Sequence, residues 1–426
     1  MRVTLLAVGS HGDVRPYVAL GTGLARLGHD VRLASHAPFK DLAVSNGLAF
    51  AAIEGNPRDI VLGPEGQAWL ESANNPLLFL KRTSRIAAMV LDKLSDDALG
   101  ATRGSDAIVY SMPLASSGYS IAEALRIPGV PAALYPLHPT CAFASVLASN
   151  LPLRCGLANW ASGFAVAQLF WQVFRSSHNR WRRRALGLGP APVLAPLAEW
   201  ENRGVPFLYG YSPSFLPVPG AWGPTRAVTG YWFLDRPKEW VPPAGLLEFL
   251  DAGPPPLYAG FGSMAESDNE RLTTVVLQAV RRTGCRAVLA AGWGGLAARD
   301  LPREVFPIGS VPHDWLLPRV SVAIHHGGAG TTAAALRAGV PSVVVPFFAD
   351  QFFWGSRVAR LGLGPRPIPR KELSAEALCA AIARALRVPL RERCTHMAAR
   401  IQAEDGIRDA AARLDCYLST TRRTRR

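Results

Sequence analysis

The sequence predicts an α/β protein with two doubly wound parallel sheets, and three observations support this class. Short apolar runs alternate with amphipathic stretches in both halves of the chain, which is the pattern of repeated β–α–β units. The length of 426 residues is enough for two ordinary domains. Apolar residues make up 49% of the chain, so each domain has the side chains for a large core.

The N-terminal half opens with a β–α–β unit. We expect a strand at 2–8 (RVTLLAV), a glycine-bearing loop at 9–16 (GSHGDVRP), a helix at 17–29 and a strand at 30–36. Strands joined by a helical crossover run parallel. The same half has further strand patterns at 106–111 and 131–136, with a helical pattern at 116–127 between them.

A second series of strands and helices follows a segment rich in proline and glycine. That segment, 216–226, predicts a linker between a domain at 1–215 and a domain at 227–400. A last helix, from 372 to about 417, is long enough to return 401–426 to the first domain. The second series has strand patterns at 227–232, 256–263, 286–292, 305–310, 322–327 and 342–347, and helical patterns at 269–284 and 331–339.

Charge and cysteine usage narrow the class of function. The net charge is +14, much of it at 175–184 and in the C-terminal TRRTRR. We interpret the tail as a solvated end; the inner cluster is either a solvated face or a contact with anionic lipid or an acidic partner. No nucleic-acid-binding module is recognisable. Six scattered cysteines without a C-x-x-C pair, and a start without a signal-peptide pattern, predict reduced thiols and a cytoplasmic protein.

An uncharged segment at 155–174 has the length to span a bilayer. Glycines weaken it as a helix, and polar side chains fall near one helical stripe. We therefore expect an amphipathic helix packed on a domain. The glycines are Gly156 and Gly163, and the polar residues are Asn159, Ser162, Gln168 and Gln172.

The segment IHHGGAGTT, 324–332, combines two histidines with three glycines where a strand ends and a helix begins. Backbone N–H groups and the positive end of a helix dipole form an anion site at such a turn, and glycine lets a phosphate approach the backbone. The segment is neither a P-loop nor the G-x-G-x-x-G of dehydrogenases. From the turn alone, a ligand site and a tight turn with core histidines are equally good interpretations. Adjacent histidines in a strand point to opposite faces, so at most one is expected to face a ligand.

Several stretches resemble the family-one glycosyltransferases, which have the two-domain GT-B fold. The stretch HHGGAGTTAAALRAGVPSVVVPFFADQ (325–351) resembles their donor-binding signature. The motifs stand in the family's order over nearly the whole chain, closest to the bacterial natural-product and sterol glucosyltransferase branch. The resemblance implies two Rossmann-like domains facing a cleft. Further matches are FGSM (261–264), AGWGG (291–295) and SVPHDWLLP (310–318) for the donor-side loops, and GSHGDVRPYVALGTGLARLGHDV (9–31) for the acceptor-side loop and helix.

The resemblance also implies donor-binding roles. His325 takes the place of the family's phosphate-contacting histidine, and Asp350 with Gln351 takes the place of the pair that holds sugar hydroxyls. Ala333 stands where the plant branch has a ribose-binding glutamate, so a uridine and a thymidine nucleotide both remain open. No cofactor or metal is implied, because the nucleotide-sugar is a co-substrate and D-x-D does not occur in the sequence. The other expected donor contacts are Ser263, Trp293, Val311, His313, Gly327, Gly328, Gly330 and Thr331.

The loop 9–16 offers two candidates for the base that deprotonates the acceptor hydroxyl. Asp13 stands three residues before Pro16, where the family has its base, and we prefer it to His11, which is then a helper or an acceptor contact. The structural alternative for Asp13 is the N-cap of the first helix, since Pro16 would then lie near the first helical turn.

Together these features predict an inverting, metal-independent transfer of a sugar from a UDP- or dTDP-sugar to a hydroxyl of a bulky hydrophobic acceptor. The expected acceptor is of polyketide, macrolide, sterol or glycolipid type, as in antibiotic and other natural product biosynthesis. An apolar acceptor fits the absence of Asp, Glu, Lys and Arg from 127–153, and the nearby basic cluster adds the hypothesis of a peripheral contact with an anionic membrane. Two rival interpretations are a sugar-nucleotide epimerase on the same fold and a non-catalytic lipid-binding relative.

Overall fold

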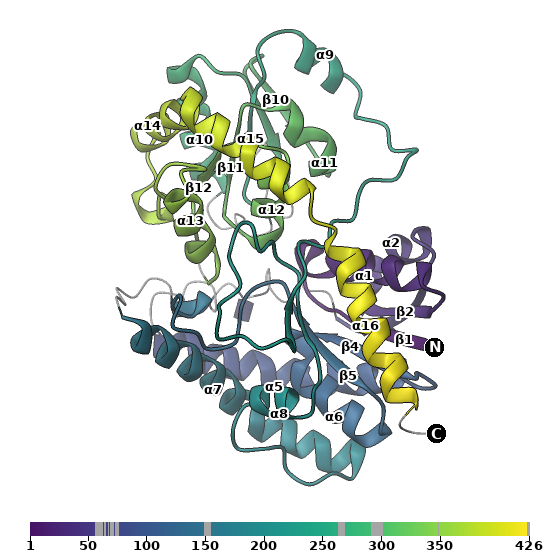
Figure 1. Cartoon of the computed structure of the whole chain (residues 1–426). Helices are drawn as coiled ribbons and strands as arrows, with labels where there is room; N and C mark the ends of the chain where they lie inside the picture. Colours follow the sequence, from purple (N-terminus) through teal and green to yellow (C-terminus); the bar gives the residue numbers. More distant parts are fainter. Residues whose placement is uncertain are drawn as a thin grey trace. The chain divides into compact units, whose positions relative to one another are not determined.

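The computed structural model describes residues 1–55, 63, 65–66, 68, 72, 76–148, 155–262, 269–290, 301–347 and 349–423. The chain divides into two compact units. Unit 1 comprises Met1–Leu234 and Glu404–Arg426, and unit 2 comprises Asp235–Ala403. Each unit is built on one parallel sheet, so the predicted α/β class with two doubly wound sheets is confirmed (Figure 1).

The sheet of unit 1 has the strand order β3-β2-β1-β4-β5-β6-β7. Every pair is parallel, and β1 lies between β2 and β4. Its core residues Val3 and Leu5 are fully buried. The strands are β1 Arg2–Leu6, β2 Asp30–His36, β3 Ala49–Ile53, β4 Ala107–Ser111, β5 Gly129–Ala133, β6 Phe207–Tyr209 and β7 Arg226–Val228; the helices are α1 His11–Arg26, α2 Lys40–Ser45, α5 Pro76–Ala101, α6 Ala115–Leu125, α7 Gly156–Trp181, α8 Leu197–Asn202 and α16 Gly406–Arg423.

The sheet of unit 2 has the order β10-β9-β8-β11-β12, again parallel throughout. Apolar cores cover it on both faces, because alternate residues of β8 and β11 belong to two separate clusters. The strands are β8 Leu257–Gly260, β9 Ala287–Ala290, β10 Val305–Ile308, β11 Val322–His325 and β12 Ser342–Val344; the helices are α9 Leu246–Asp251, α10 Asn269–Thr283, α11 His313–Leu316, α12 Ala329–Arg337, α13 Gln351–Arg360, α14 Ala375–Ala385 and α15 Val388–Gln402.

The segment predicted as a linker, 216–226, belongs to unit 1. It runs between β6 and β7, which pair with each other, and Phe215 and Leu216 are buried. The strand expected at 227–232 in the second domain is therefore the last strand of the first sheet. The chain leaves unit 1 only after Leu234.

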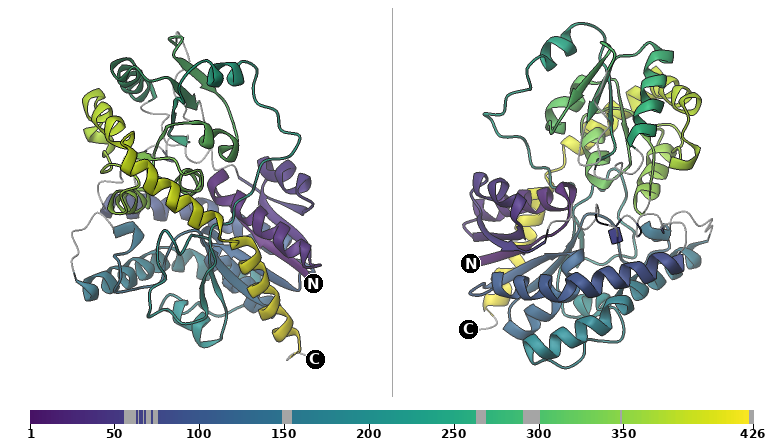
Figure 2. Two further views of the ribbon diagram at one scale, coloured as in Figure 1. Left: turned by 45° about the horizontal axis from the view of Figure 1, so that its top comes forward. Right: turned by 180° about the vertical axis from the view of Figure 1, so that it is seen from behind.

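The long C-terminal helix is three helices, because Pro389 at the start of α15 and Gly406 at the start of α16 interrupt it. The last of them, α16, packs along α1 (Figure 2). A Cβ on Gly23 of α1 would lie 2.6 Å from Ile407 Cγ2, so glycine permits this close approach. His29 Nε2 lies 3.1 Å from Asp415 Oδ1 at the other end of the contact.

The segment 155–174 forms most of α7, which packs beside α5. The expectation that this segment packs on the domain as a helix is confirmed. Within the described residues, no helix has the length and apolar character needed to cross a membrane.

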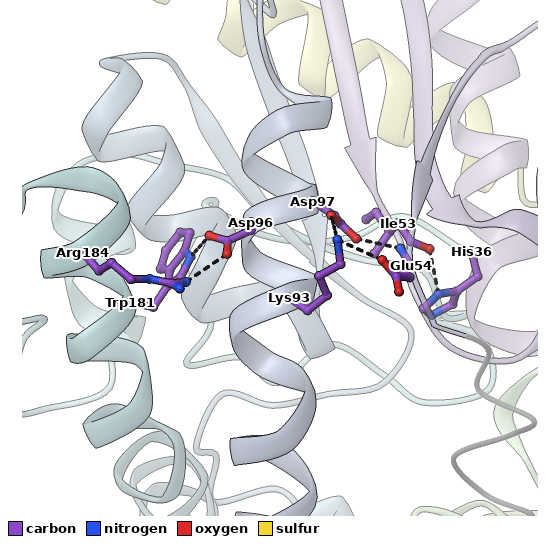
Figure 3. Close-up of polar contacts among 8 residues, drawn as sticks. All are labelled: His36, Ile53, Glu54, Lys93, Asp96, Asp97, Trp181 and Arg184. Carbon is purple, nitrogen blue, oxygen red and sulfur yellow. Dashed lines mark hydrogen bonds and ion pairs between the residues drawn. The ribbon is translucent and has the colours of Figure 1, made fainter.

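Helix α5 makes polar contacts with two different neighbours, on opposite sides of its axis (Figure 3). Asp96 accepts hydrogen bonds from Trp181 Nε1 at 2.8 Å and from Arg184 at 2.9 Å, which fixes the C-terminal end of α7. Lys93 Nζ lies 2.9 Å from Glu54 Oε2, which ties α5 to the end of β3. Arg184 of the basic cluster therefore forms an ion pair with another helix of the same unit.

Candidate functional site

The candidate site residues of unit 2 follow the carboxyl ends of the central strands. The strand order reverses between β8 and β11, and His325, the last residue of β11, stands opposite Gly260, the last residue of β8. In open α/β sheets a ligand binds beyond the carboxyl ends of the strands at such a reversal. Ser263 and Trp293 lie outside the described residues.

The two histidines of the turn have different environments. His325 is fully buried, and its Nδ1 accepts a hydrogen bond from the Gly327 N–H at 3.0 Å. His326 is only partly buried and lies beside Gly262, two residues after β8, and Gly328, the N-cap of α12. The partial exposure of His326 is an observation in favour of this ring as the one that faces a ligand, while the phosphate contact of His325 stays a prediction.

The glycines around His326 make room for its ring. A Cβ on Gly328 would lie 2.5 Å from His326 Nε2, and a Cβ on Gly262 would lie 3.2 Å from His326 Cε1. Gly327 is required for a different reason. Its φ is +88°, which favours glycine, and a Cβ there would lie 2.6 Å from Val344 Cγ1. The glycine run is thus required by packing and backbone conformation as well as by any ligand.

Both imidazoles are neutral at pH 7. Burial lowers the pKa of His325 to about 3, with a further contribution from His326. Burial also lowers the pKa of His326 to about 4, and the electrostatic interaction with His313 lowers it further. Among the described residues, His325 Nε2 and His326 Nδ1 are buried without a hydrogen-bond partner. A bound anion would provide such a partner.

The helix α12 begins directly after this turn. Gly328 is its N-cap, and Gly330 and Thr331 lie in its first turn, where backbone N–H groups lack partners within the helix. Its Gly330 is exposed and its Thr331 half-buried. The turn therefore directs N–H groups and the positive end of the helix dipole to the same side as His326.

The predicted sugar-binding pair, Asp350 and Gln351, stands beside the same turn. Asp350 accepts a hydrogen bond from Trp354 Nε1 at 3.0 Å, and Gln351 Oε1 accepts one from the Phe347 N–H at 2.7 Å. A Cβ on Gly327 would lie 3.1 Å from the Gln351 carbonyl oxygen, so the pair is adjacent to the histidine turn. Ala349 has φ +53°, a strained left-handed conformation that holds the entry into α13.

Val311 lies three residues after the end of β10, and His313 is the first residue of α11. Val311 is buried, and His313 Nε2 lies 3.1 Å from the Tyr258 hydroxyl of β8. Both residues therefore follow the same edge of the sheet as the histidine turn.

The candidate site of unit 1 follows β1, next to the reversal between β1 and β4. The expected loop at 9–16 is in fact helical from His11, and Pro16 lies inside α1. Asp13 is the third residue of this helix, and its Oδ2 accepts hydrogen bonds from the Ser10 N–H and the Ser10 hydroxyl, both at 2.8 Å. The N-cap alternative for Asp13 is therefore wrong in position, because Ser10 is the N-cap and Asp13 closes a capping box from the third helical position. This contact uses Oδ2 and leaves Oδ1 available for a second role.

The two candidate bases differ in how their pKa values shift. Asp13 as a residue is exposed to solvent, but protein atoms surround its carboxylate. The resulting desolvation raises the pKa of Asp13, and the hydrogen bonds from Ser10 partly oppose this shift. Partial burial and then Arg15 lower the pKa of His11. A carboxylate with a raised pKa is a stronger proton acceptor than an ordinary one, so Asp13 keeps its candidacy.

Two structural features beside the candidate residues escaped the sequence analysis. His326 was considered only as a neighbour of His325; the signal for it is that the glycines flank it, which only the folded turn reveals. Gly9 was not singled out, although it has φ +128° and a Cβ on it would lie 2.6 Å from Asp13 Oδ2.

Two family models match the chain. Residues 3–144 match the glycosyltransferase family 28 N-terminal domain, and residues 277–414 match the C-terminal domain of erythromycin biosynthesis protein CIII-like proteins.

Curated relatives carry the name sterol 3-beta-glucosyltransferase. The protein from Neosartorya fischeri is 38% identical over 423 residues, covering 96% of this chain and 29% of the relative. The protein from Cryptococcus neoformans var. neoformans serotype D is 38% identical over 388 residues, covering 85% of this chain and 24% of the relative. The chain thus spans less than a third of the length of these relatives.

Solved glycosyltransferase structures share the fold. The calicheamicin glycosyltransferase CalG4 has a TM-score of 0.68 at 21% identity and covers 99% of this chain and 98% of its own. The glycosyltransferase VinC in complex with dTDP has a TM-score of 0.68 at 18% identity and covers 99% of this chain and 100% of its own. These likenesses concern the fold.

Proposed function

The chain belongs to the family-one GT-B glycosyltransferases, and from this premise we propose that it transfers glucose from a nucleotide-sugar to the hydroxyl of a sterol-like acceptor. The observation that carries the proposal is the convergence of His326, the start of α12 and the pair Asp350–Gln351 at one edge of the unit 2 sheet. An anion-binding turn beside hydroxyl-binding side chains suits a sugar diphosphate.

In the proposed donor complex, His326 and the first N–H groups of α12 contact the diphosphate. Asp350 and Gln351 accept hydrogen bonds from sugar hydroxyls, and Val311 with His313 contacts the base. UDP and dTDP are both proposed carriers. The diphosphate charge is met by these protein groups, so we propose that transfer requires no metal or other cofactor.

In the proposed reaction, Asp13 takes the proton of the acceptor hydroxyl. The hydroxyl oxygen forms a bond to the anomeric carbon while the bond from that carbon to the diphosphate oxygen breaks, with inversion, and the nucleoside diphosphate leaves. Ser10 holds Oδ2 of Asp13 through two hydrogen bonds and so orients Oδ1. The raised pKa of Asp13 supports proton acceptance.

The acceptor side of the proposal rests on the loop after β5. Residues 134–148 follow the same carboxyl edge of the unit 1 sheet as His11, and they contain no Asp, Glu, Lys or Arg. The curated relatives are named for sterol glucosylation, so we place a sterol before a polyketide or macrolide. A role in antibiotic biosynthesis and a cytoplasmic location remain hypotheses.

The deciding experiment offers the purified chain UDP-glucose or dTDP-glucose with a sterol, a macrolide or an aminocyclitol, in the presence of EDTA. We expect a sterol glucoside and an equal amount of nucleoside diphosphate. Asp13→Asn should lower kcat about a hundredfold or more, because a positioned base contributes on that order, while nucleotide affinity stays unchanged. Asp30→Asn, an exposed carboxylate paired with Arg2, is the control.

Four outcomes would count against parts of this proposal. Preference for the aminocyclitol would exclude the apolar acceptor, and turnover restored only by manganese or magnesium would exclude metal-independent transfer. Conversion of the nucleotide-sugar without any acceptor would favour the epimerase, and nucleotide-sugar left intact with every acceptor would favour the non-catalytic relative.

A further inference from the structure

One face of α7 exposes large apolar side chains. Leu157 is 75% exposed, Trp160 44% and Phe164 43%, and the rings of Trp160 and Phe164 stack with centroids 5.6 Å apart. Exposed Ala161 and Ala165 complete the stripe, because these positions recur at helical spacing. We propose that this outer face of α7 docks on an anionic lipid bilayer.

The loop that follows α7 extends the stripe. Val193 is 62% exposed and Leu194 60%. Gln168 Nε2 donates to the Val193 carbonyl at 2.9 Å, and Gln168 Oε1 accepts from the Ala195 N–H at 3.0 Å. Gln168 is four residues after Phe164, so the tethered loop continues the apolar stripe along the helix. We define the outer face as Leu157, Trp160, Ala161, Phe164, Ala165, Val193 and Leu194.

The opposite side of α7 holds the protein with polar contacts. Asn159 Nδ2 donates to the Cys141 carbonyl at 3.1 Å, and the Ser162 hydroxyl accepts from the Ser145 N–H at 2.9 Å. A Cβ on Gly163 would lie 2.8 Å from Pro139 Cα. The prediction that the four polar residues fall near one helical stripe is therefore wrong. Asn159 and Ser162 contact the loop before α7, whereas Gln168 and Gln172 contact the loop after it.

This arrangement reverses the usual order of an amphipathic helix on a soluble domain. Such a helix directs its apolar stripe to the core and its polar residues to water. Here polar side chains bind the protein, and tryptophan, phenylalanine and leucine face outward. A contiguous apolar patch of this kind marks an interaction surface. Stacked tryptophan and phenylalanine side chains are typical of helices that lie in the interface of a bilayer.

Charge selects the occupant of the face. Between Glu123 and Glu199 the chain has no Asp or Glu, and Arg180 and Arg183 are exposed at the end of α7. Neither arginine has an ion-pair partner among the described residues. A second copy of this surface would meet it with charge of the same sign, whereas anionic lipid headgroups complement it.

The basic cluster at 175–184 offers fewer unpaired arginines for lipid binding than its sequence suggested. Arg182 is 2% exposed and pairs with Glu123 at 3.1 Å. Arg184 binds Asp96 at 2.9 Å. These two arginines stabilise the end of α7, so the apolar stripe is the docking element, and the exposed Arg180 and Arg183 follow it along the chain.

The experiment is flotation of the full chain with vesicles, without donor or acceptor, so its result does not depend on the proposed function. Vesicles of pure phosphatidylcholine are compared with vesicles containing phosphatidylglycerol. We expect binding to the anionic vesicles, weakened by high salt. Trp160→Ser with Phe164→Ser should lower the partition coefficient about tenfold or more, because burying each ring in lipid contributes strongly.

The matched control is Leu27→Ser with Val44→Ser, which removes two other exposed apolar side chains of unit 1. Leu157→Ser alone is a second, milder variant, and thermal unfolding checks the fold of each. Equal partitioning of wild type and the Trp160/Phe164 variant, or no binding of wild type to anionic vesicles, would overturn the proposal. A wild-type dimer that dissociates in this variant, measured by light scattering, would assign the face to self-association instead.

Discussion

The carboxylate of Asp13 occupies the space in which a side chain of residue 9 would lie. A Cβ on Gly9 would approach Asp13 Oδ2 to 2.6 Å, and Gly9 has φ +128°, which other residues rarely adopt. The candidate base, its capping contact with Ser10 and the glycine are therefore one structural unit.

Replacing Gly9 by alanine should displace Asp13 as well as strain the backbone. We expect Gly9→Ala to lower kcat strongly. Gly28→Ala is the matched control, because Gly28 has φ +85° but nothing lies within 4 Å of a Cβ there. Both variants should lose roughly 1 kcal/mol or more of unfolding free energy from backbone strain. Equal activity of the two variants would show that Gly9 serves the backbone alone.

Substitutions of the two histidines should affect different properties of the protein, nucleotide binding for His326 and stability for His325. His326→Ala should weaken binding of UDP or dTDP, measured by calorimetry, by about 1.5–3 kcal/mol, the size of a hydrogen bond to a charged group. His325→Ala should mainly lower the melting temperature, since this ring is fully buried and accepts the Gly327 N–H. The reverse pattern would return the phosphate contact to His325, as the sequence first indicated.

The sequence predicts many helices and strands of both units well, but it does not predict how individual side chains of the candidate site are oriented. The apolar runs identified β2 at 30–36, and helical periodicity identified α10 within one residue of its end. Which of two adjacent histidines faces a ligand depends on where β11 stops and how the glycines pack, and neither follows from periodicity.

Other differences have similar physical causes. The pairing of Ser10 with Asp13 starts α1 at His11, before a proline that suggested a later start. The short strand β7 pairs with β6, so its sheet is decided by a long-range contact. The arginines at 182 and 184 find partners on helices far away in sequence, Glu123 and Asp96, which charge counting does not reveal.

The contact between Gly328 and His326 can be tested by a double-mutant cycle. Gly328 has an ordinary φ of −61°, so Gly328→Ala acts through the 2.5 Å approach of its Cβ to His326 Nε2 rather than through the backbone. We expect Gly328→Ala to lower nucleotide affinity and stability in the native background. With His326→Ala already present, the same change should cost much less, since neighbouring substitutions are not additive. Additive effects would mean that the ring moves away freely and does not require the glycine.

The pH dependence of donor binding follows from the lowered pKa of His326. Burial holds this pKa at about 4 in the free protein, so the ring is neutral at pH 7. A bound diphosphate is an anion beside the ring and raises its pKa, so binding takes up a proton wherever the pH lies between the free and the bound value. Affinity should therefore rise as the pH falls through the bound-state pKa, and level off near pH 4.

The measurement is calorimetry of an intact nucleotide-sugar near pH 5 and pH 8, in buffers of different ionisation enthalpy. An intact nucleotide-sugar is required because a free terminal phosphate itself titrates near pH 6. We expect proton uptake at the lower pH that disappears in His326→Ala and persists in His325→Ala, provided the latter folds by circular dichroism. Proton uptake that survives in His326→Ala, or an affinity that falls on acidification from pH 8 to pH 5, would remove His326 from the diphosphate site.

The lowered pKa of His326 also predicts that the folded state loses stability on acidification. In the unfolded chain this imidazole takes up its proton near the ordinary pKa of 6.5, whereas in the folded chain it does so only near the lowered pKa of about 4. This part of the loss should be absent in His326→Ala, and saturating donor should reduce it in the wild type by raising the folded-state pKa.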